Sequence, residues 1–149
     1  MIKISCQEQL LPGSSLQDKW EFAARAGYDG IELRGRGDFA FAERLPELRE
    51  ALRDGVPMPS VCVEMLHFFG AFDAGLRRDA IAQMKSQLSV LAALGGGVVG
   101  TPASYGMFSR RLPPFEPPRS PEEDRDVLLS GLAELGEHAA REGVVLVLE

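Results

Sequence analysis

Amphipathic stretches and short apolar runs alternate along this chain, and glycines mark the junctions. Four stretches rich in Ala, Leu, Glu and Arg end at Gly27, Gly55, Gly95 and Gly143, and each gives way to an apolar run. Glycine suits the left-handed conformation that ends many helices. With a first strand at 2–6, the predicted order is βαβαβαβαβ, which implies a mostly parallel sheet. The later strands are expected at 28–33, 61–65, 98–100 and 143–149.

Helix starts can also be located. Ser120 precedes Pro121, and Glu123 follows three residues after the serine, which together predict a capped helix from Pro121 to about Glu142. Ser15 and Asp18 repeat this pattern before the first helix. We expect the second helix to be shorter and to start near residue 46, and the third to run over about 74–94.

The last strand is an uninterrupted apolar run that finishes at Glu149. Such a run is typical of a parallel strand covered on both faces. An acid at the end of a buried strand commonly points into a site. We therefore expect Glu149 to be functional, and we expect residues 1–149 to form a single domain that is truncated after its fifth strand.

A long segment, 101–119, separates the fourth strand from the fourth helix and contains Tyr105 and five prolines. Loops that leave the carboxyl ends of parallel strands build active sites in α/β proteins. We interpret this segment as a lid that brings Tyr105 to a substrate. A rigid proline-rich excursion or an oligomer contact is the alternative.

Three acids fall at or near predicted strand ends: Glu32, Glu64 and Glu149. A buried carboxylate without a partner is costly, so each needs a cation, a metal or solvent. Glu32 could bind substrate, or it could form an ion pair with Arg34 or Arg36. For Glu64, exposure to solvent at the mouth of a loop is the simpler explanation.

Histidines and nucleophilic motifs are scarce. His67 follows the third predicted strand, where it could reach a substrate, and His138 is expected to be solvated on a helix. The sequence has no His-x-x-x-His or Cys-x-x-Cys pair, so no complete metal site is visible in it. Gly95-Gly96-Gly97 precedes a strand instead of opening a helix, which excludes a phosphate-binding loop.

Composition and charge narrow the class of partner. The chain has 149 residues, 45% of them hydrophobic, and a net charge of −6. That charge disfavours binding to nucleic acid or to anionic membranes, and favours small molecules. Cys6 and Cys62 lie in apolar runs without metal-type spacing, which favours reduced thiols and a cytoplasmic location.

Two folds accommodate five strands and four helices. One is a flavodoxin-like doubly wound sheet, which normally continues with a fifth helix. The other is the N-terminal half of a (β/α)₈ TIM barrel, a fold of about 250 residues when complete.

The residues favour the barrel. The segment from Ser15 through Gly27 to the sequence Gly-Ile-Glu-Leu at 30–33 resembles the opening of the xylose-isomerase-like TIM barrel family of sugar and sugar-phosphate isomerases and epimerases. The similarity continues through Arg77 to Gly95 and on to Glu149, so it spans nearly the whole chain.

The resemblance implies a divalent-metal-dependent isomerase or epimerase of a sugar, sugar phosphate or keto sugar, working by proton transfer through an enediolate. In such enzymes the residue matching Glu149 binds Mn²⁺, Mg²⁺, Co²⁺ or Zn²⁺ and moves the proton. The other ligands of the family lie on strands six to eight, which are absent from these residues. The isolated chain would then be inactive, and Glu32, Arg34, His67 and Tyr105 would contact a carbohydrate.

Three alternatives stay open. The family also includes dehydratases of inositol-type keto sugars and phosphodiesterases like the type IV apurinic endonucleases. The chain could also be a non-catalytic half-barrel that needs a partner, either another copy of itself or a C-terminal half.

Overall fold

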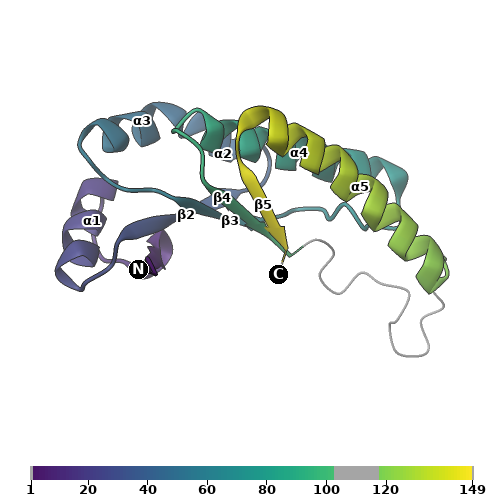
Figure 1. The fold of residues 1–149 in the computed structure, drawn as a ribbon, viewed down its shortest axis with the longest axis horizontal. Helices are drawn as coiled ribbons and strands as arrows, with labels where there is room; N and C mark the ends of the chain where they lie inside the picture. Colours follow the sequence, from purple (N-terminus) through teal and green to yellow (C-terminus); the bar gives the residue numbers. More distant parts are fainter. Residues whose placement is uncertain (1, 103–117, 149) are drawn as a thin grey trace.

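A computed structural model describes residues 2–102 and 118–148 and shows one parallel sheet with helices packed along it (Figure 1). The strands pair in the order β1-β2-β3-β4-β5, and every pair is parallel. A doubly wound flavodoxin-like sheet would have the order 2-1-3-4-5. The sequential order therefore rules out that alternative and matches the first five strands of a barrel.

Helices and strands alternate as the sequence predicts. The strands are β1 (Ser5–Gln7), β2 (Gly30–Arg36), β3 (Ser60–Glu64), β4 (Val98–Thr101) and β5 (Val145–Leu148). The helices are η1 (Glu8–Leu10), α1 (Leu16–Arg25), α2 (Ala40–Glu43), α3 (Leu45–Arg53), α4 (Ala74–Ala92) and α5 (Pro121–Glu142).

The predicted helix ends are confirmed by the backbone. Gly27, Gly55, Gly95 and Gly143 all have positive φ angles, as a left-handed residue after a helix requires. Both predicted capping boxes are present as well. The side chain of Ser15 accepts a hydrogen bond from the amide of Asp18, and Ser120 does the same for Glu123.

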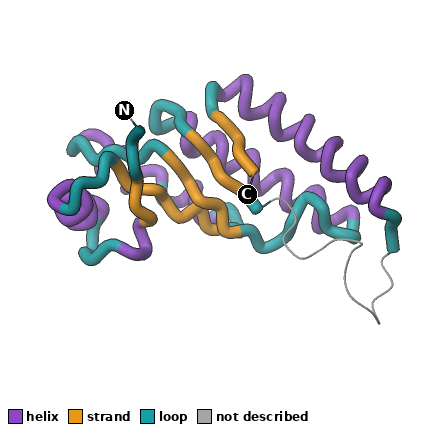
Figure 2. Tube along the Cα trace, turned by 60° about the horizontal axis from the view of Figure 1, so that its bottom comes forward, coloured by secondary structure: helices purple, strands orange, loops and turns teal. Residues whose placement is uncertain are grey.

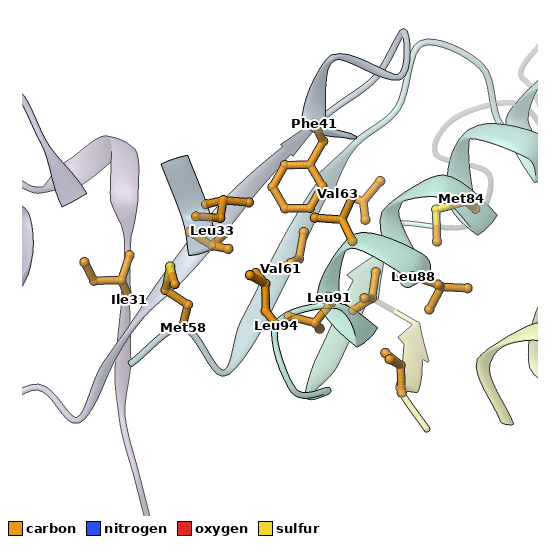
Figure 3. Close-up of a cluster of buried hydrophobic side chains, with 14 of the residues drawn as sticks. Ile31, Leu33, Phe41, Met58, Val61, Val63, Met84, Leu88, Leu91 and Leu94 are labelled. Atoms are coloured by element: carbon orange, nitrogen blue, oxygen red, sulfur yellow. The ribbon is translucent and has the colours of Figure 1, made fainter. Parts of the chain in front are cut away.

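The core lies between the sheet and the helices. Ile31, Leu33 and Val61 point from β2 and β3 toward the helices and are fully buried. Figure 3 shows Leu91 of α4 beside Val61, with Met84 and Leu88 of the same helix farther along the cluster. The three-to-four-residue spacing on α4 therefore produces the buried stripe that its sequence indicates.

Some expectations were wrong. The first strand is shorter than expected and shifted toward the C-terminus, because the chain turns into η1 after Gln7. The short helix α2 was not expected. His138 is not fully solvated: its ring lies between α5 and α4, with Nε2 3.1 Å from Oγ of Ser89.

Candidate functional site at the carboxyl ends of the strands

The face of the sheet opposite the core carries most of the polar strand residues. The register sets Glu32 beside Ser60, and Arg36 beside Glu64. Since side chains alternate along a strand, residues two apart share a face, and residues paired across neighbouring strands share one too. The open face, as we call it, consists on β2 and β3 of Glu32, Arg34, Arg36, Ser60, Cys62 and Glu64.

Apolar residues continue the open face toward β5. The pairing sets Val98 beside Val145, and Gly100 beside Val147. Val145 is 56% exposed and Val147 is 39% exposed, although their apolar character is that of a buried strand. The open face is thus charged at β2 and β3 and apolar at β4 and β5. Figure 2 shows the strands of the sheet in orange.

A two-pronged ion pair joins β2 to β3 on the open face. Arg34 donates from Nε and Nη2 to the two carboxylate oxygens of Glu64, each at 2.8 Å. The hydrogen bonds from Arg34 hold the pKa of Glu64 below its usual value, so the carboxylate is ionised at neutral pH. Exposed pairs add little to stability. This pair instead presents hydrogen-bond donors and acceptors to a ligand on the open face.

Glu32 contacts a neighbouring strand. Its Oε1 accepts a hydrogen bond from the hydroxyl of Ser60 at 3.1 Å. Of the two arginines considered as ion-pair partners for Glu32, Arg34 is bound to Glu64 instead. Glu64 itself is exposed, as predicted, although its partner was not foreseen.

A buried acid supports the open face from the side. Glu8 follows β1 directly and is only 4% exposed. Its carboxylate accepts two hydrogen bonds from Arg44, at 2.7 and 3.0 Å, and one from the backbone amide of Arg34 at 2.7 Å. Burial acts to raise the pKa of Glu8, but these bonds outweigh it and lower the pKa. Glu8 therefore fixes the backbone that carries Arg34.

A second network lies behind the loops that follow β2 and β3. The Nε2 atom of His67 is 3.7 Å from Oδ2 of Asp79 on α4. That carboxylate accepts a hydrogen bond from Gln83, whose Oε1 in turn accepts from the backbone amide of Asp38 at 3.3 Å. Gln83 is buried. The network ties the loop after β3 to the loop after β2.

The structure thus brings together some of the predicted site residues. Glu32 and Arg34 share the open face, whereas His67 lies in the loop beyond β3 and faces α4. Tyr105 and Glu149 lie outside the described residues, and so does most of the segment interpreted as a lid.

Sequence reasoning missed Glu8 and Arg44. Glu8 carries a signal similar to that of Glu64, an acid at the carboxyl end of a parallel strand, and a correct end for β1 would have revealed it. Arg44 carries no such signal, because only tertiary contact brings α3 to the end of β1.

The described residues contain neither a group of possible metal ligands nor a membrane-spanning helix. Within 2–102 and 118–148, no three His, Cys, Asp or Glu side chains are grouped so that they could hold a metal ion. In the same ranges no helix is long and apolar enough to cross a membrane.

A comparison with protein families decides the relationship. A sequence model described as "xylose isomerase-like TIM barrel" matches residues 20–149. The chain belongs to the xylose isomerase-like TIM barrel family. The resemblance drawn from the residues at 15–33 and around Gly143 is thereby confirmed, and so is the half-barrel fold.

Individual relatives within this family are sugar epimerases by name. The chain is 32% identical over 149 residues to the 3-dehydro-D-guloside 4-epimerase of Escherichia coli (strain K12). Among solved structures, it matches 3-keto-D-glucoside 4-epimerase from E. coli, apo form, with a TM-score of 0.85 and 31% identity. It matches D-allulose 3-epimerase from Methylomonas sp. with a TM-score of 0.71 and 20% identity, which supports the fold alone.

The extent of these matches is uneven. Each of the three comparisons includes 99% of this chain, but only 56%, 56% and 50% of the respective relative. The chain therefore spans about half the length of the family members it matches.

Proposed function

We propose that the protein is a sugar isomerase or epimerase that acts on a keto sugar by moving a proton at the carbon next to the carbonyl. The observation that carries this proposal is the 32% identity to a 3-dehydro-D-guloside 4-epimerase across the whole chain. The open face supports it, because ionised and hydrogen-bonding groups stand at the strand ends where barrel enzymes bind substrate.

The chemistry requires a base and a way to hold the developing charge. A base removes the proton from carbon, the electron pair moves to the carbonyl oxygen, and an enediolate forms. Return of a proton to the opposite side of the same carbon gives the epimer, and return to the neighbouring carbon gives the isomer. We assign the base to Glu149, which the alternation expected from the sequence relates to Val145 and Val147.

Arg34 and Glu64 are suited to orienting the sugar. Carboxylates accept hydrogen bonds from hydroxyl groups, and a guanidinium donates to hydroxyl or carbonyl oxygens. Both groups are ionised and exposed, and Glu8 fixes the backbone of Arg34. A substrate lying along the open face would exchange their contacts with water for contacts with its hydroxyls. Glu32 and Tyr105 stay proposed substrate contacts, and His67 would act from the loop beyond β3.

We further propose that the active form is a complete barrel, because the relatives are almost twice as long as the matched region. The remaining strands would come from further sequence or from a partner chain. Residues on them would complete a divalent-metal site with Glu149, and the metal (Mn²⁺, Mg²⁺, Co²⁺ or Zn²⁺) would stabilise negative charge on oxygen. A cytoplasmic location stays a prediction, to be checked by fractionation.

The test is solvent exchange. The full-length protein is incubated in D₂O with 3-keto glucosides and with ketoses, with each metal in turn, and deuterium at the carbon next to the carbonyl is followed by NMR. We expect exchange that chelation with EDTA abolishes, and we expect Glu149→Gln to slow it at least about a hundredfold.

The control is Glu137→Gln, which removes an exposed carboxylate of α5 and should leave the rate unchanged. Exchange that survives Glu149→Gln would refute the role of Glu149. Elimination of water from the keto sugar would identify a dehydratase instead, and cleavage of abasic DNA would identify a phosphodiesterase. Absence of any reaction would favour a non-catalytic half-barrel.

A further inference from the structure

A small cavity lies between the ends of β2 and β3, next to the Arg34–Glu64 pair. Its volume is about 160 Å³, and it is lined by Arg36, Gly37, Asp38, Glu64, Met65 and Leu66. Since a water molecule in the liquid occupies about 30 Å³, the cavity holds a few waters or a small polar substituent. It is too small for a whole ligand of drug size.

The wall formed by the loop after β2 is held in an unusual conformation. Asp38 and Phe39 both have φ angles of 60°, although neither is a glycine. Strain of this kind persists where surrounding contacts impose it, and it concentrates at functional sites. Here the buried Gln83 accepts a hydrogen bond from the amide of Asp38, and Ala40 donates from its amide to the carbonyl of Gly37.

Close packing fixes the same wall. A Cβ atom added to Gly37 would stand 3.0 Å from Cγ of Leu66 and 3.1 Å from Oε1 of Gln83. Both distances are tighter than ordinary van der Waals contact, so a side chain at this position would displace its neighbours. The cavity is therefore preorganised by α4, through Gln83, and by the loop after β3, through Leu66. Neither residue takes part in the Arg34–Glu64 pair.

Charges around the cavity are balanced. Arg36 and Arg34 supply two positive charges, and Asp38 and Glu64 supply two negative ones. A phosphate in this space would lie beside two carboxylates, with one guanidinium already bound to Glu64. Neutral hydroxyl groups suit it better, because they donate to carboxylates and accept from guanidinium groups.

We propose that this cavity is a subsite for hydroxyl groups of an uncharged sugar, and that Asp38 selects against phosphorylated sugars. The proposal deepens the proposed function, on which it rests for the sugar as substrate class. Arg36 donates to sugar oxygens, Asp38 accepts from sugar hydroxyls, and the carbon that reacts lies outside the cavity, along the open face.

The test is binding, which does not depend on turnover. The full-length protein is titrated calorimetrically with D-fructose and with D-fructose 6-phosphate, while NMR follows the backbone amides of Gly37 and Leu66. We expect D-fructose to bind more tightly and to shift both amides. Arg36→Gln should weaken the binding of D-fructose about tenfold, which is the effect of losing one hydrogen bond to a charged group.

Asp38→Asn tests the specificity for uncharged sugars. Asparagine is the replacement because it tolerates the positive φ at this position. The substitution should weaken the binding of D-fructose. It should also reduce the ratio of the affinity for D-fructose to the affinity for D-fructose 6-phosphate at least threefold. Arg25→Gln and Asp126→Asn, which alter exposed residues of α1 and α5, should change neither affinity.

The results separate this subsite from the proposed function. Three outcomes would refute the subsite while deuterium exchange leaves the epimerase proposal standing. D-fructose 6-phosphate could bind more tightly than D-fructose, neither amide could shift, or both cavity variants could bind D-fructose normally. If D-fructose binds with the expected shifts but no sugar exchanges deuterium, the epimerase proposal fails alone. If neither sugar binds, the subsite is refuted.

Discussion

Single residues at the strand ends have two distinct tasks in this structure. Glu64 and Arg34 meet at the surface, where solvent screens their attraction and keeps the net gain small. Glu8 and Arg44 make the same type of pair in a buried position, where the loss of one partner is costly. The first pair is available to a ligand, and the second holds the chain in place.

Replacing Glu8 by Gln should lower the free energy of unfolding by about 3 kcal/mol at pH 7, the cost of breaking a buried ion pair. Because the folded-state pKa of Glu8 lies below its usual value of 4.5, its stabilisation is complete above about pH 4.5 and is lost as the pH falls through the folded pKa. Urea unfolding at pH 7, 4 and 3 measures this.

The difference between wild type and Glu8→Gln should therefore shrink toward acid pH. Glu50→Gln, an exposed residue of α3, serves as the matched control and should change stability by less than about 0.5 kcal/mol at each pH. A constant difference across the pH range would show that Glu8 does not act through its charge.

At the scale of elements, one arginine connects two loops at the carboxyl end of the sheet. Arg119 precedes α5, and its side chain is 14% exposed. Its guanidinium donates to the carbonyls of Gly70 and Ala71, pairs with Asp124, and lies over the ring of Phe72. The start of α5 is thereby fixed to the loop that leads into α4.

Arg119→Gln should destabilise the protein by about 2 kcal/mol, because it removes several hydrogen bonds to a charged group. The loss should be local first, so amide hydrogen exchange at Ala71 should accelerate more than exchange in β3. Arg125→Gln, an exposed change on the same helix, should have no such effect. Equal acceleration in β3 would show that the arginine supports the whole fold instead.

The sequence predicted the elements well where the signal is local. The glycines at 27, 55, 95 and 143 and the serines at 15 and 120 act on backbone groups within a few residues of themselves, so their meaning can be read without tertiary structure. The helix α2 depends on Asp38 and Phe39 in a conformation that their residue types do not favour. The amide of Asp38 donates to Gln83, which is distant in sequence.

The candidate site was predictable only in part, for the same reason. Alternation along a strand sets Glu32 and Arg34 on one face of β2 and Ile31 and Leu33 on the other, so this arrangement follows from the strand's own residues. The choice of partners, Ser60 for Glu32 and Glu64 for Arg34, depends on the register between strands, which the single strands do not encode. The pair of Glu8 and Arg44 needs contact between β1 and α3, so no local pattern announces it.

At the scale of the whole molecule, helices cover one face of the sheet and leave the other exposed within the residues that the structure describes. Helices α3, α4 and α5 lie in a row along one side of the sheet (Figure 1). On the other side Val145 and Val147 stay exposed, and within the described residues β1 and β5 form the edges of the sheet. Exposed apolar surface and unpaired edges favour association.

Residues 1–149 produced alone should therefore associate with themselves, as sedimentation velocity would show. Val147→Lys should reduce this association, since a charge would then lie on the apolar part of the open face. Leu129→Lys, which replaces an exposed leucine of α5, is the matched control and should leave it unchanged. A stable monomer of the unaltered residues would contradict the need for a covering partner.

The uneven open face has a consequence for how a substrate would be oriented once that face is covered. Once covered, the valines of β5 would exclude water, while the ion pair between β2 and β3 would retain it, so electrical screening would fall from one end of the sheet to the other. Charge that develops on a reacting sugar interacts more strongly with fixed groups where screening is weak. The molecule would hold the hydroxyl end of a sugar in the wet region and carry out proton transfer in the dry one.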